Sequence, residues 1–228
     1  DKIQGISPYK SPTDMGVNMA GFAIVDDAVC QAASRMEILR RYYTGLVDRV
    51  KGKCDECVVR KLEIVMQQAG VTPDICPAVR ASLDKAQATG APAGAMVLPD
   101  GRVVTGKTSS LLGPSAAMLL NAVKLLAGID KDLDLLPASI IAPISDMKLR
   151  HLGHHNPRLH SDEVLIALSI SAVTNPLAER VLKKLDDLRG SEAHFSVILS
   201  EEDAKLYKRL GIHVSCEPRY EVKKLYHK

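Results

Sequence analysis

Residues 95–106 read Ala-Met-Val-Leu-Pro-Asp-Gly-Arg-Val-Val-Thr-Gly, and this stretch predicts a β-hairpin. Pro99 presets the φ angle at the start of a tight turn, and Gly101 accepts the positive φ that such a turn requires. Apolar and β-branched residues flank the turn over 95–98 and 102–106. We therefore expect two antiparallel strands here, at the start of a sheet.

Helical periodicity dominates the chain before this hairpin, and strands alternate with helices after it. The segment 89–94, Thr-Gly-Ala-Pro-Ala-Gly, marks the change with the small residues and proline typical of a boundary. The pattern predicts an α/β protein. A polar N-terminal segment and a helical subdomain occupy residues 1–90, and a three-layer α-β-α sandwich with a mixed sheet occupies residues 91–228. Helices are expected over 27–50, 55–68, 74–88, 114–127, 161–173, 176–188 and 201–210. Further strands are expected over 194–199 and 212–216. The pattern of residues 137–145 fits either a helix or a strand.

Composition and charge favour a soluble, cytosolic protein. The chain has 228 residues, of which 46% are hydrophobic, enough for one large core or two small ones. No apolar run reaches the ~18 residues of a membrane span, and the start at Asp1 lacks a secretory signal. The formal charge of +3 is spread over 30 basic and 27 acidic residues, so neither nucleic acid nor a membrane is an expected partner. Five cysteines favour reduced thiols, and the missing initial Met suggests a preceding segment.

Two short motifs match known ligand-binding motifs only in part. Residues 101–108, Gly-Arg-Val-Val-Thr-Gly-Lys-Thr, match the spacing of a phosphate loop, which needs a strand before it and a helix that begins at the lysine. Here the β-branched pair follows a hairpin turn and Pro114 places the next helix start well beyond Lys107, so the context argues against such a loop. Cys54 and Cys57 supply only half of a tetrahedral zinc shell, and two thiols on a helix are the simpler interpretation.

The richest cluster of reactive side chains lies in residues 151–163, His-Leu-Gly-His-His-Asn-Pro-Arg-Leu-His-Ser-Asp-Glu, directly before an apolar segment. A helix should begin here, and its unpaired amides and dipole favour a bound anion. His160, Asp162 and Glu163 are therefore candidates for proton transfer. The alternative is structural: Ser161 or Asp162 caps the helix, and His160 bonds a neighbouring loop.

Glu192 and His194 form a second candidate group at the start of an expected strand. Strand ends in α/β sheets often carry ligand groups. The alternative is an imidazole at the edge of the core, with His194 and Ser196 on one face of the strand. The catalytic interpretation gains weight only if His194 meets His160 in one cavity.

A resemblance rests on four stretches: Ser-Pro-Tyr-Lys-Ser-Pro-Thr-Asp-Met-Gly-Val-Asn-Met-Ala-Gly (7–21), Leu-Pro-Asp-Gly-Arg-Val-Val-Thr-Gly-Lys-Thr-Ser (98–109), Asn-Pro-Arg-Leu-His-Ser-Asp-Glu-Val-Leu-Ile-Ala-Leu-Ser-Ile-Ser-Ala (156–172) and Glu-Ala-His (192–194). Over essentially its whole length, the chain resembles the C-terminal half of an uncharacterised bacterial domain-of-unknown-function family, whose members are sometimes labelled ATP-dependent peptidases. The resemblance implies a fragment. Family members carry an additional N-terminal part with a Gly-Ser-Gly-Lys loop, so any nucleotide would bind through that part.

The C-terminal part of that family is similar in architecture to the cytidine-deaminase-like sandwich, and residues 98–128 resemble its hairpin and following helix. Deaminase chemistry needs a zinc-ligating Cys or His and a general-acid Glu at the start of that helix, and a Pro-Cys-x-x-Cys pair. This chain has Ser-Ala-Ala at 115–117 and lacks the cysteine pair. The resemblance therefore implies the fold without the deaminase reaction.

These observations predict part of a cytosolic enzyme that acts on a small anionic or phosphorylated ligand. His160 and His194 would move protons, oriented by Asp162, Glu163 or Glu192. A divalent metal held by the same imidazoles and carboxylates is a variant. The ligand-binding candidates, in which lysine supplies a point charge and arginine a bidentate fork, are Lys107, Thr108, Ser109, Asn156 and Arg158.

The competing hypothesis is a non-catalytic assembly or regulatory domain of a larger nucleotide-binding protein, and a homo-oligomer is expected. In this hypothesis the long first helix, with Arg-Arg-Tyr-Tyr at 40–43, contacts another subunit, and the polar clusters are internal networks. A structure separates the two. The enzyme hypothesis needs Arg158, His160 and His194 around one accessible cavity.

Overall fold

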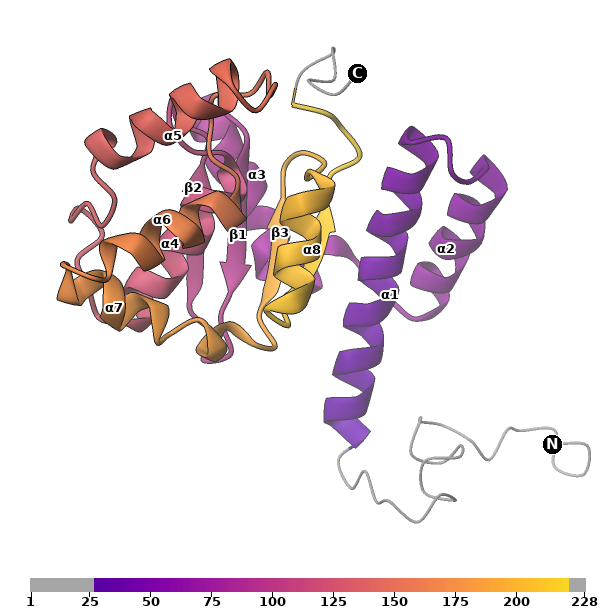
Figure 1. Ribbon diagram of the computed structural model, residues 1–228. Helices are drawn as coiled ribbons and strands as arrows, with labels where there is room; N and C mark the ends of the chain where they lie inside the picture. Colours follow the sequence, from indigo (N-terminus) through magenta and orange to yellow (C-terminus); the bar gives the residue numbers. More distant parts are fainter. Residues whose placement is uncertain (1–26, 222–228) are drawn as a thin grey trace, which may run out of the picture.

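The computed structural model describes residues 27–221, so the predicted polar segment that precedes them lies outside the described residues. Within this range eight α-helices accompany a four-stranded sheet (Figure 1). The helices are α1 (Asp27–Val50), α2 (Glu56–Gln68), α3 (Pro77–Thr89), α4 (Pro114–Leu126), α5 (Ala138–Arg150), α6 (Ser161–Ser171), α7 (Pro176–Leu182) and α8 (Glu201–Arg209). The strands are β1 (Ala93–Val97), β2 (Val103–Lys107), β3 (Glu192–Phe195) and β4 (His213–Cys216), and short 3-10 turns cover Pro73–Ile75 and Asp186–Leu188.

The sheet is mixed and has the order β2-β1-β3-β4. β1 runs antiparallel to β2 and β3, and β3 runs parallel to β4. The predicted turn closes the β1–β2 hairpin: Gly101 has a φ of 83°, and its amide donates to the carbonyl of Leu98 at 2.8 Å. The predicted α/β class and mixed sheet are therefore confirmed.

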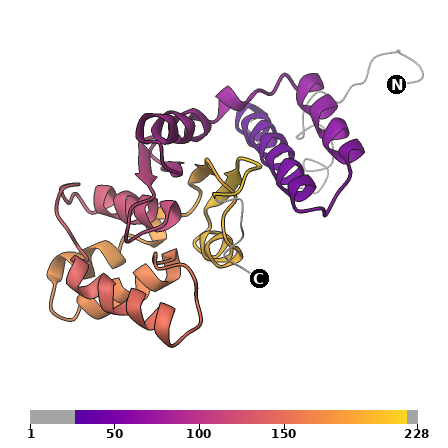
Figure 2. The same ribbon diagram turned by 90° about the horizontal axis from the view of Figure 1, so that it is seen from above.

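Helices cover both faces of the sheet, with a separate core on each (Figure 2). The larger core includes residues of α4, α6, α7 and α8, and the smaller one includes residues of α1, α2 and α3. Neighbouring residues of β3 point into different cores, as the pleat of a strand requires. Phe195 packs on Tyr207 of α8 with ring centroids 5.5 Å apart, whereas His194 packs on Tyr43 of α1 at 4.6 Å.

β2 lies directly on α4, and a glycine permits this close approach. A Cβ atom at Gly106 would lie 2.2 Å from the backbone nitrogen of Met118. Backbone atoms cannot move aside as a flexible side chain can, so any larger residue would push β2 and α4 apart. This contact fixes the position of α4 relative to the sheet.

The strand expected over 194–199 is the shorter β3, which has four residues. Its partner β1 sets this limit. The first residue of β1, Ala93, accepts the amide of Ser196 at 2.9 Å, and β1 offers no residue beyond it for further pairing. His194 consequently lies inside the strand rather than at its start.

The structure also decides the form of two helical stretches and one motif. Residues 137–145, which fitted either type of structure, lead into and belong largely to α5, which contains Pro143. The helix expected over 176–188 divides into α7 and a 3-10 turn. Residues 101–108 form the hairpin turn and β2 rather than a phosphate loop. None of the helices in the described range is long and apolar enough to cross a membrane.

Candidate functional site

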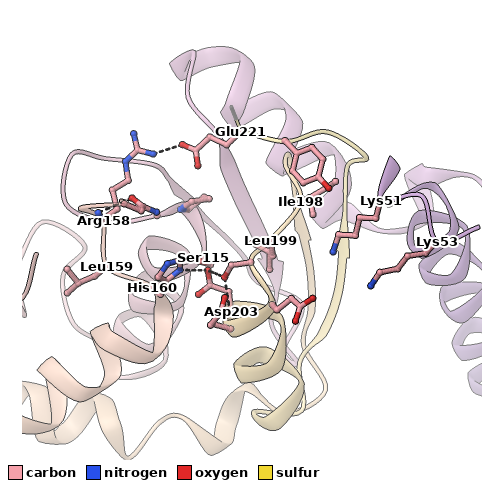
Figure 3. A pocket seen from close by; sticks show the side chains of 17 residues that line it. Lys51, Lys53, Ser115, Arg158, Leu159, His160, Ile198, Leu199, Asp203 and Glu221 are labelled. Carbon is pink, nitrogen blue, oxygen red and sulfur yellow. Dashed lines mark hydrogen bonds and ion pairs between the residues drawn. The ribbon is translucent and has the colours of Figure 1, made fainter. Parts of the chain in front are cut away.

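A pocket of about 490 Å³ lies where three helices begin (Figure 3). The residues that precede α4, α6 and α8 are Gly113, His160 and Ser200, and all three line this pocket. The first turn of a helix has amide N–H groups without helical partners and a partial positive charge. The convergence of three such turns therefore favours a negatively charged group in the pocket.

A short parallel bridge brings the starts of α4 and α6 together. The amide of Leu159 donates to the carbonyl of Leu111 at 3.0 Å, and the carbonyl of Leu159 accepts the amide of Gly113 at 3.4 Å. Ser115 follows in the first turn of α4 and lines the pocket, although it is only 1% exposed. Its hydroxyl forms no hydrogen bond with any of residues 27–221.

His160 and Asp203 form the polar centre of the pocket. Nδ1 of His160 lies 3.3 Å from Oδ2 of Asp203, and Oδ1 accepts the amide of Ser161 at 2.8 Å. The hydroxyl of Ser200 donates to the same carboxylate at 3.0 Å and accepts the amide of Asp203 at 3.1 Å, which caps α8. The side chain of Asp203 is 6% exposed and that of His160 is 17% exposed, so water screens the pair only weakly.

The pKa values of both groups are shifted in the direction that favours an ion pair. The hydrogen bond to Asp203 raises the pKa of His160 above its usual 6.5, against the opposing effect of burial. Burial alone would raise the pKa of Asp203, but hydrogen bonds from His160 and Ser161 outweigh it and lower that pKa to about 2. His160 therefore stays positively charged to a higher pH than a free imidazole does. Its Nε2 has no hydrogen-bond partner among the described residues.

Lys148 of α5 anchors the segment that carries these residues. Its Nζ donates to the carboxylate of Glu163 at 2.6 Å and to the carbonyl of Arg158 at 2.8 Å. The same oxygen of Glu163 accepts the amide of His160 at 2.8 Å. Glu163 thus holds the backbone in place rather than lining the pocket. Asp162 is exposed and also lies off the pocket wall.

Two of the predicted ligand-binding residues, Asn156 and Arg158, do line the pocket. The side-chain oxygen of Asn156 accepts the amide of Arg158 at 3.1 Å, which fixes the turn before α6. The guanidinium of Arg158 pairs with the carboxylate of Glu221 from the C-terminal segment. The sequence therefore located both residues at this pocket, and their binding of a ligand stays a prediction.

The other three predicted ligand-binding residues lie away from this pocket. Lys107 is exposed at the end of β2. Thr108 is buried, and its hydroxyl has no hydrogen-bond partner in the described part of the chain. The hydroxyl of Ser109 accepts the amides two and three residues ahead, at 3.2 and 3.0 Å, and so stabilises a turn. The structure therefore does not bring these three residues to the pocket of Asn156 and Arg158, and their binding of a ligand stays a prediction.

Glu192 and His194 lie on the other side of the sheet. His194 is 0% exposed, and its Nδ1 lies 2.7 Å from the hydroxyl of Ser215. Its Nε2 lies 3.2 Å from the carboxylate of Glu217. The expectation that His160 and His194 share one cavity is wrong, because the pleat of β3 directs His194 toward α1. The enzyme hypothesis in the form that needs both histidines around one cavity is therefore not supported.

Arg40 and Tyr43 of α1 were expected to contact another subunit. In the structure they make contacts within their own chain. Arg40 pairs with Glu192 and with Glu37. Tyr43 is 5% exposed and packs on His194, and burial raises the pKa of its hydroxyl well above the usual 10. These contacts attach α1 to the sheet, so they do not leave Arg40 and Tyr43 free for a second subunit.

Sequence reasoning did not single out Asp203, Lys51 or Lys53. Ser200 and Asp203 have the Ser-x-x-Asp spacing of a helix start, which signals the cap but not the partner 43 positions away. No group of three or more His, Cys, Asp or Glu side chains that could hold a metal ion occurs in the part of the chain that the structure describes. The divalent-metal variant therefore has no ready set of ligands there.

Comparison with known proteins identifies the family. The domain of unknown function DUF1846 matches in two parts, its N-terminal model over residues 1–70 and its C-terminal model over residues 74–226. A UPF0371 protein of Corynebacterium glutamicum is 52% identical to this chain over 228 residues. UPF0371 proteins of Streptococcus thermophilus and Streptococcus pyogenes are 50% identical. Each alignment covers 100% of this chain and 46% of the relative, so the chain spans about half the length of these curated relatives. The resemblance found in the sequence is confirmed, and the chain belongs to the DUF1846 family.

Proposed function

We propose that this chain binds a small phosphorylated ligand in the pocket and that His160 exchanges a proton with it. The observation that carries the proposal is the His160–Asp203 pair at the point where α4, α6 and α8 begin. Helix N-termini bind phosphate through amide hydrogen bonds and the dipole, and a charged imidazole adds a stronger donor. Because Asp203 holds Nδ1, Nε2 is the nitrogen left for the ligand, as in general acid–base catalysis.

The size and walls of the pocket suit a small molecule. Small-molecule sites typically enclose about 300–1,000 Å³, and this pocket falls in that range. Leu159, Ile198 and Leu199 give it an apolar wall beside the polar centre (Figure 3). The non-phosphate part of the ligand would pack against this wall, as ligands in such sites generally do.

Several expectations remain proposals for the whole protein. The order of hairpin and helix in β1, β2 and α4 supports a cytidine-deaminase-like sandwich without its zinc chemistry. The division near residue 90, a cytosolic location, and a nucleotide bound through the rest of the protein are further proposals. The chain accounts for less than half of each relative, so the chemistry of the remainder adds to whatever this pocket does.

Inorganic phosphate is the simplest probe of the proposed site. We expect isothermal titration calorimetry on the full-length protein to show saturable phosphate binding. His160→Asn should weaken that binding about tenfold or more, because it removes a charge-assisted hydrogen bond. The affinity of the unmodified protein should fall as pH rises through the pKa of His160, because deprotonation removes the positive charge.

His154→Asn is the matched control, since it removes an exposed imidazole of the same loop that does not line the pocket. Its phosphate affinity should stay within about twofold of the unmodified protein, as expected for exposed charges far from a ligand. Equal losses in both variants would count against the proposal. So would phosphate binding that does not change with pH.

A second role, in assembly, is favoured by exposed apolar side chains on α6 and in the turn that follows it. Ile166, Ile170 and Val173 are 60%, 66% and 84% exposed and recur at the spacing of one helix face. Contiguous exposed apolar side chains commonly mark a contact surface. Sedimentation analysis of the full-length protein should therefore give the mass of a homo-oligomer, and a monomer at every concentration would contradict this role.

A further inference from the structure

We propose that Lys51 and Lys53 form a second anion subsite of this pocket, so that its ligand carries two separate anionic groups, one of them a phosphate. The inference rests on the proposed function, because it takes the first anionic group to lie at the helix N-termini beside His160. It adds the class of ligand: a small molecule that is anionic at both ends.

The two lysines are distant in sequence from the other residues that line the pocket. They lie in the connection between α1 and α2, and Figure 3 shows their side chains extending toward the pocket from the side opposite Arg158. Their amides donate to carbonyls of α1 at 2.9 and 2.8 Å, and Gly52 between them has the φ of 70° that commonly ends a helix. Both ammonium groups therefore project from a well-defined turn.

These two charges are uncommitted, unlike the others around the pocket. Neither Lys51 nor Lys53 forms an ion pair with any of the residues that the structure describes. The arginine and the histidine of the pocket are each paired with a carboxylate. Two neighbouring positive charges at the rim of a cavity with an apolar wall attract an anion more strongly than the same charges in open solvent.

Carboxylates in the same pocket restrict where the negative charge of a ligand can lie. Glu201 and Glu202, in the first turn of α8, both line the pocket. They repel negative charge beside them. Anionic groups are therefore favoured beside His160 at the starts of α4 and α6 and at the lysines, and disfavoured beside Glu201 and Glu202 at the start of α8. Two separate anionic groups fit this distribution of charge better than one compact polyphosphate.

The pocket also joins the two parts of the family. Lys51 and Lys53 belong to the stretch matched by the N-terminal model, residues 1–70, and His160 belongs to the stretch matched by the C-terminal model, residues 74–226. Ligand sites often lie at such boundaries between domains. A doubly anionic ligand would connect the α1–α2 turn to the starts of α4, α6 and α8.

A series of α,ω-alkane bisphosphonates, each compared with the alkylphosphonate of the same chain length, tests the second subsite by calorimetry on the full-length protein. The best-fitting bisphosphonate should bind about tenfold more tightly than its monophosphonate, because two exposed charge pairs add to an already bound group. Shorter and longer spacers should lose this advantage. Lys51→Gln/Lys53→Gln should abolish the advantage and leave the monophosphonate affinity within about twofold.

Arg60→Gln/Lys61→Gln removes the same amount of charge from exposed positions of α2 away from the pocket, and it should keep the bisphosphonate advantage. Equal affinity of the unmodified protein for the two compound classes would overturn the second subsite and leave the first intact. If the lysine substitutions weaken the binding of bisphosphonates and monophosphonates equally, the second subsite is likewise overturned and the first stays intact. If the unmodified protein binds no phosphonate at all, the proposed function itself is refuted.

Discussion

Lys148→Ala is expected to lower the free energy of unfolding by about 3–5 kcal/mol, the typical cost of removing one partner of a buried ion pair. The side chain of Lys148 is 1% exposed and that of Glu163 is 21% exposed, so the substitution leaves a largely desolvated carboxylate without its cation. The carbonyl of Arg158 loses its donor at the same time. Urea denaturation followed by circular dichroism measures the change.

Arg150→Ala provides a matched control on the same helix. Arg150 pairs with Asp146 at 2.7 Å, but the two side chains are 72% and 54% exposed, and such pairs contribute about 0.5 kcal/mol or less. Adding Glu163→Gln to Lys148→Ala removes the uncompensated charge and keeps an acceptor for the amide of His160, so part of the lost stability should return. If Lys148→Ala costs no more than Arg150→Ala, the buried pair is not what holds this segment.

The sequence located one segment of the pocket because residues close together in the chain are close in space. Asn156, Arg158 and His160 lie within five positions just before a predicted helix start, and all three line the pocket. Asp203 and Lys51 could not be found in this way. Their place around the same pocket as His160 depends on how α8 and the α1–α2 turn are arranged relative to α6, and the spacing of residues along the chain carries no information on that arrangement.

His194 shows a second limit of sequence patterns. Alternation correctly separates the faces of His194 and Phe195, but it does not show which face lies toward the pocket, because that depends on where α4 and α8 pack. The turn at 99–101 was predictable because its chemistry is local. Helix α5 was not, because Pro143 removes one amide from the helical pattern and tertiary contacts decide between helix and strand.

The other large effect is expected from Asp203→Asn, which keeps the size of the side chain and removes its charge. With a pKa of about 2 in the folded protein against the usual 3.8, the carboxylate contributes about 2 kcal/mol of stability above 3.8, and this contribution is lost as the pH falls through 2. His160 acts in the opposite direction. Because its folded-state pKa is raised, its contribution is complete below 6.5 and is lost as the pH rises through that raised pKa. The free energy of unfolding should therefore be highest between pH 3.8 and 6.5. In Asp203→Asn, its decreases toward low pH and toward high pH should both disappear.

Thermal melting over a range of pH, together with NMR titration of the histidine, tests this expectation. In Asp203→Asn the pKa of His160 should fall, because the hydrogen bond and charge of Asp203 are lost while burial and Lys148 still lower it. Phosphate affinity near neutral pH should fall with it, since the imidazole loses its charge. Ser200→Ala is the control: it removes the α8 cap and one hydrogen bond to the same carboxylate, so it should cost about 1 kcal/mol and keep both decreases. If His160 of the unmodified protein titrates at or below 6.5, His160 and Asp203 do not form an ion pair near neutral pH, and the pocket loses the positive centre on which phosphate binding depends.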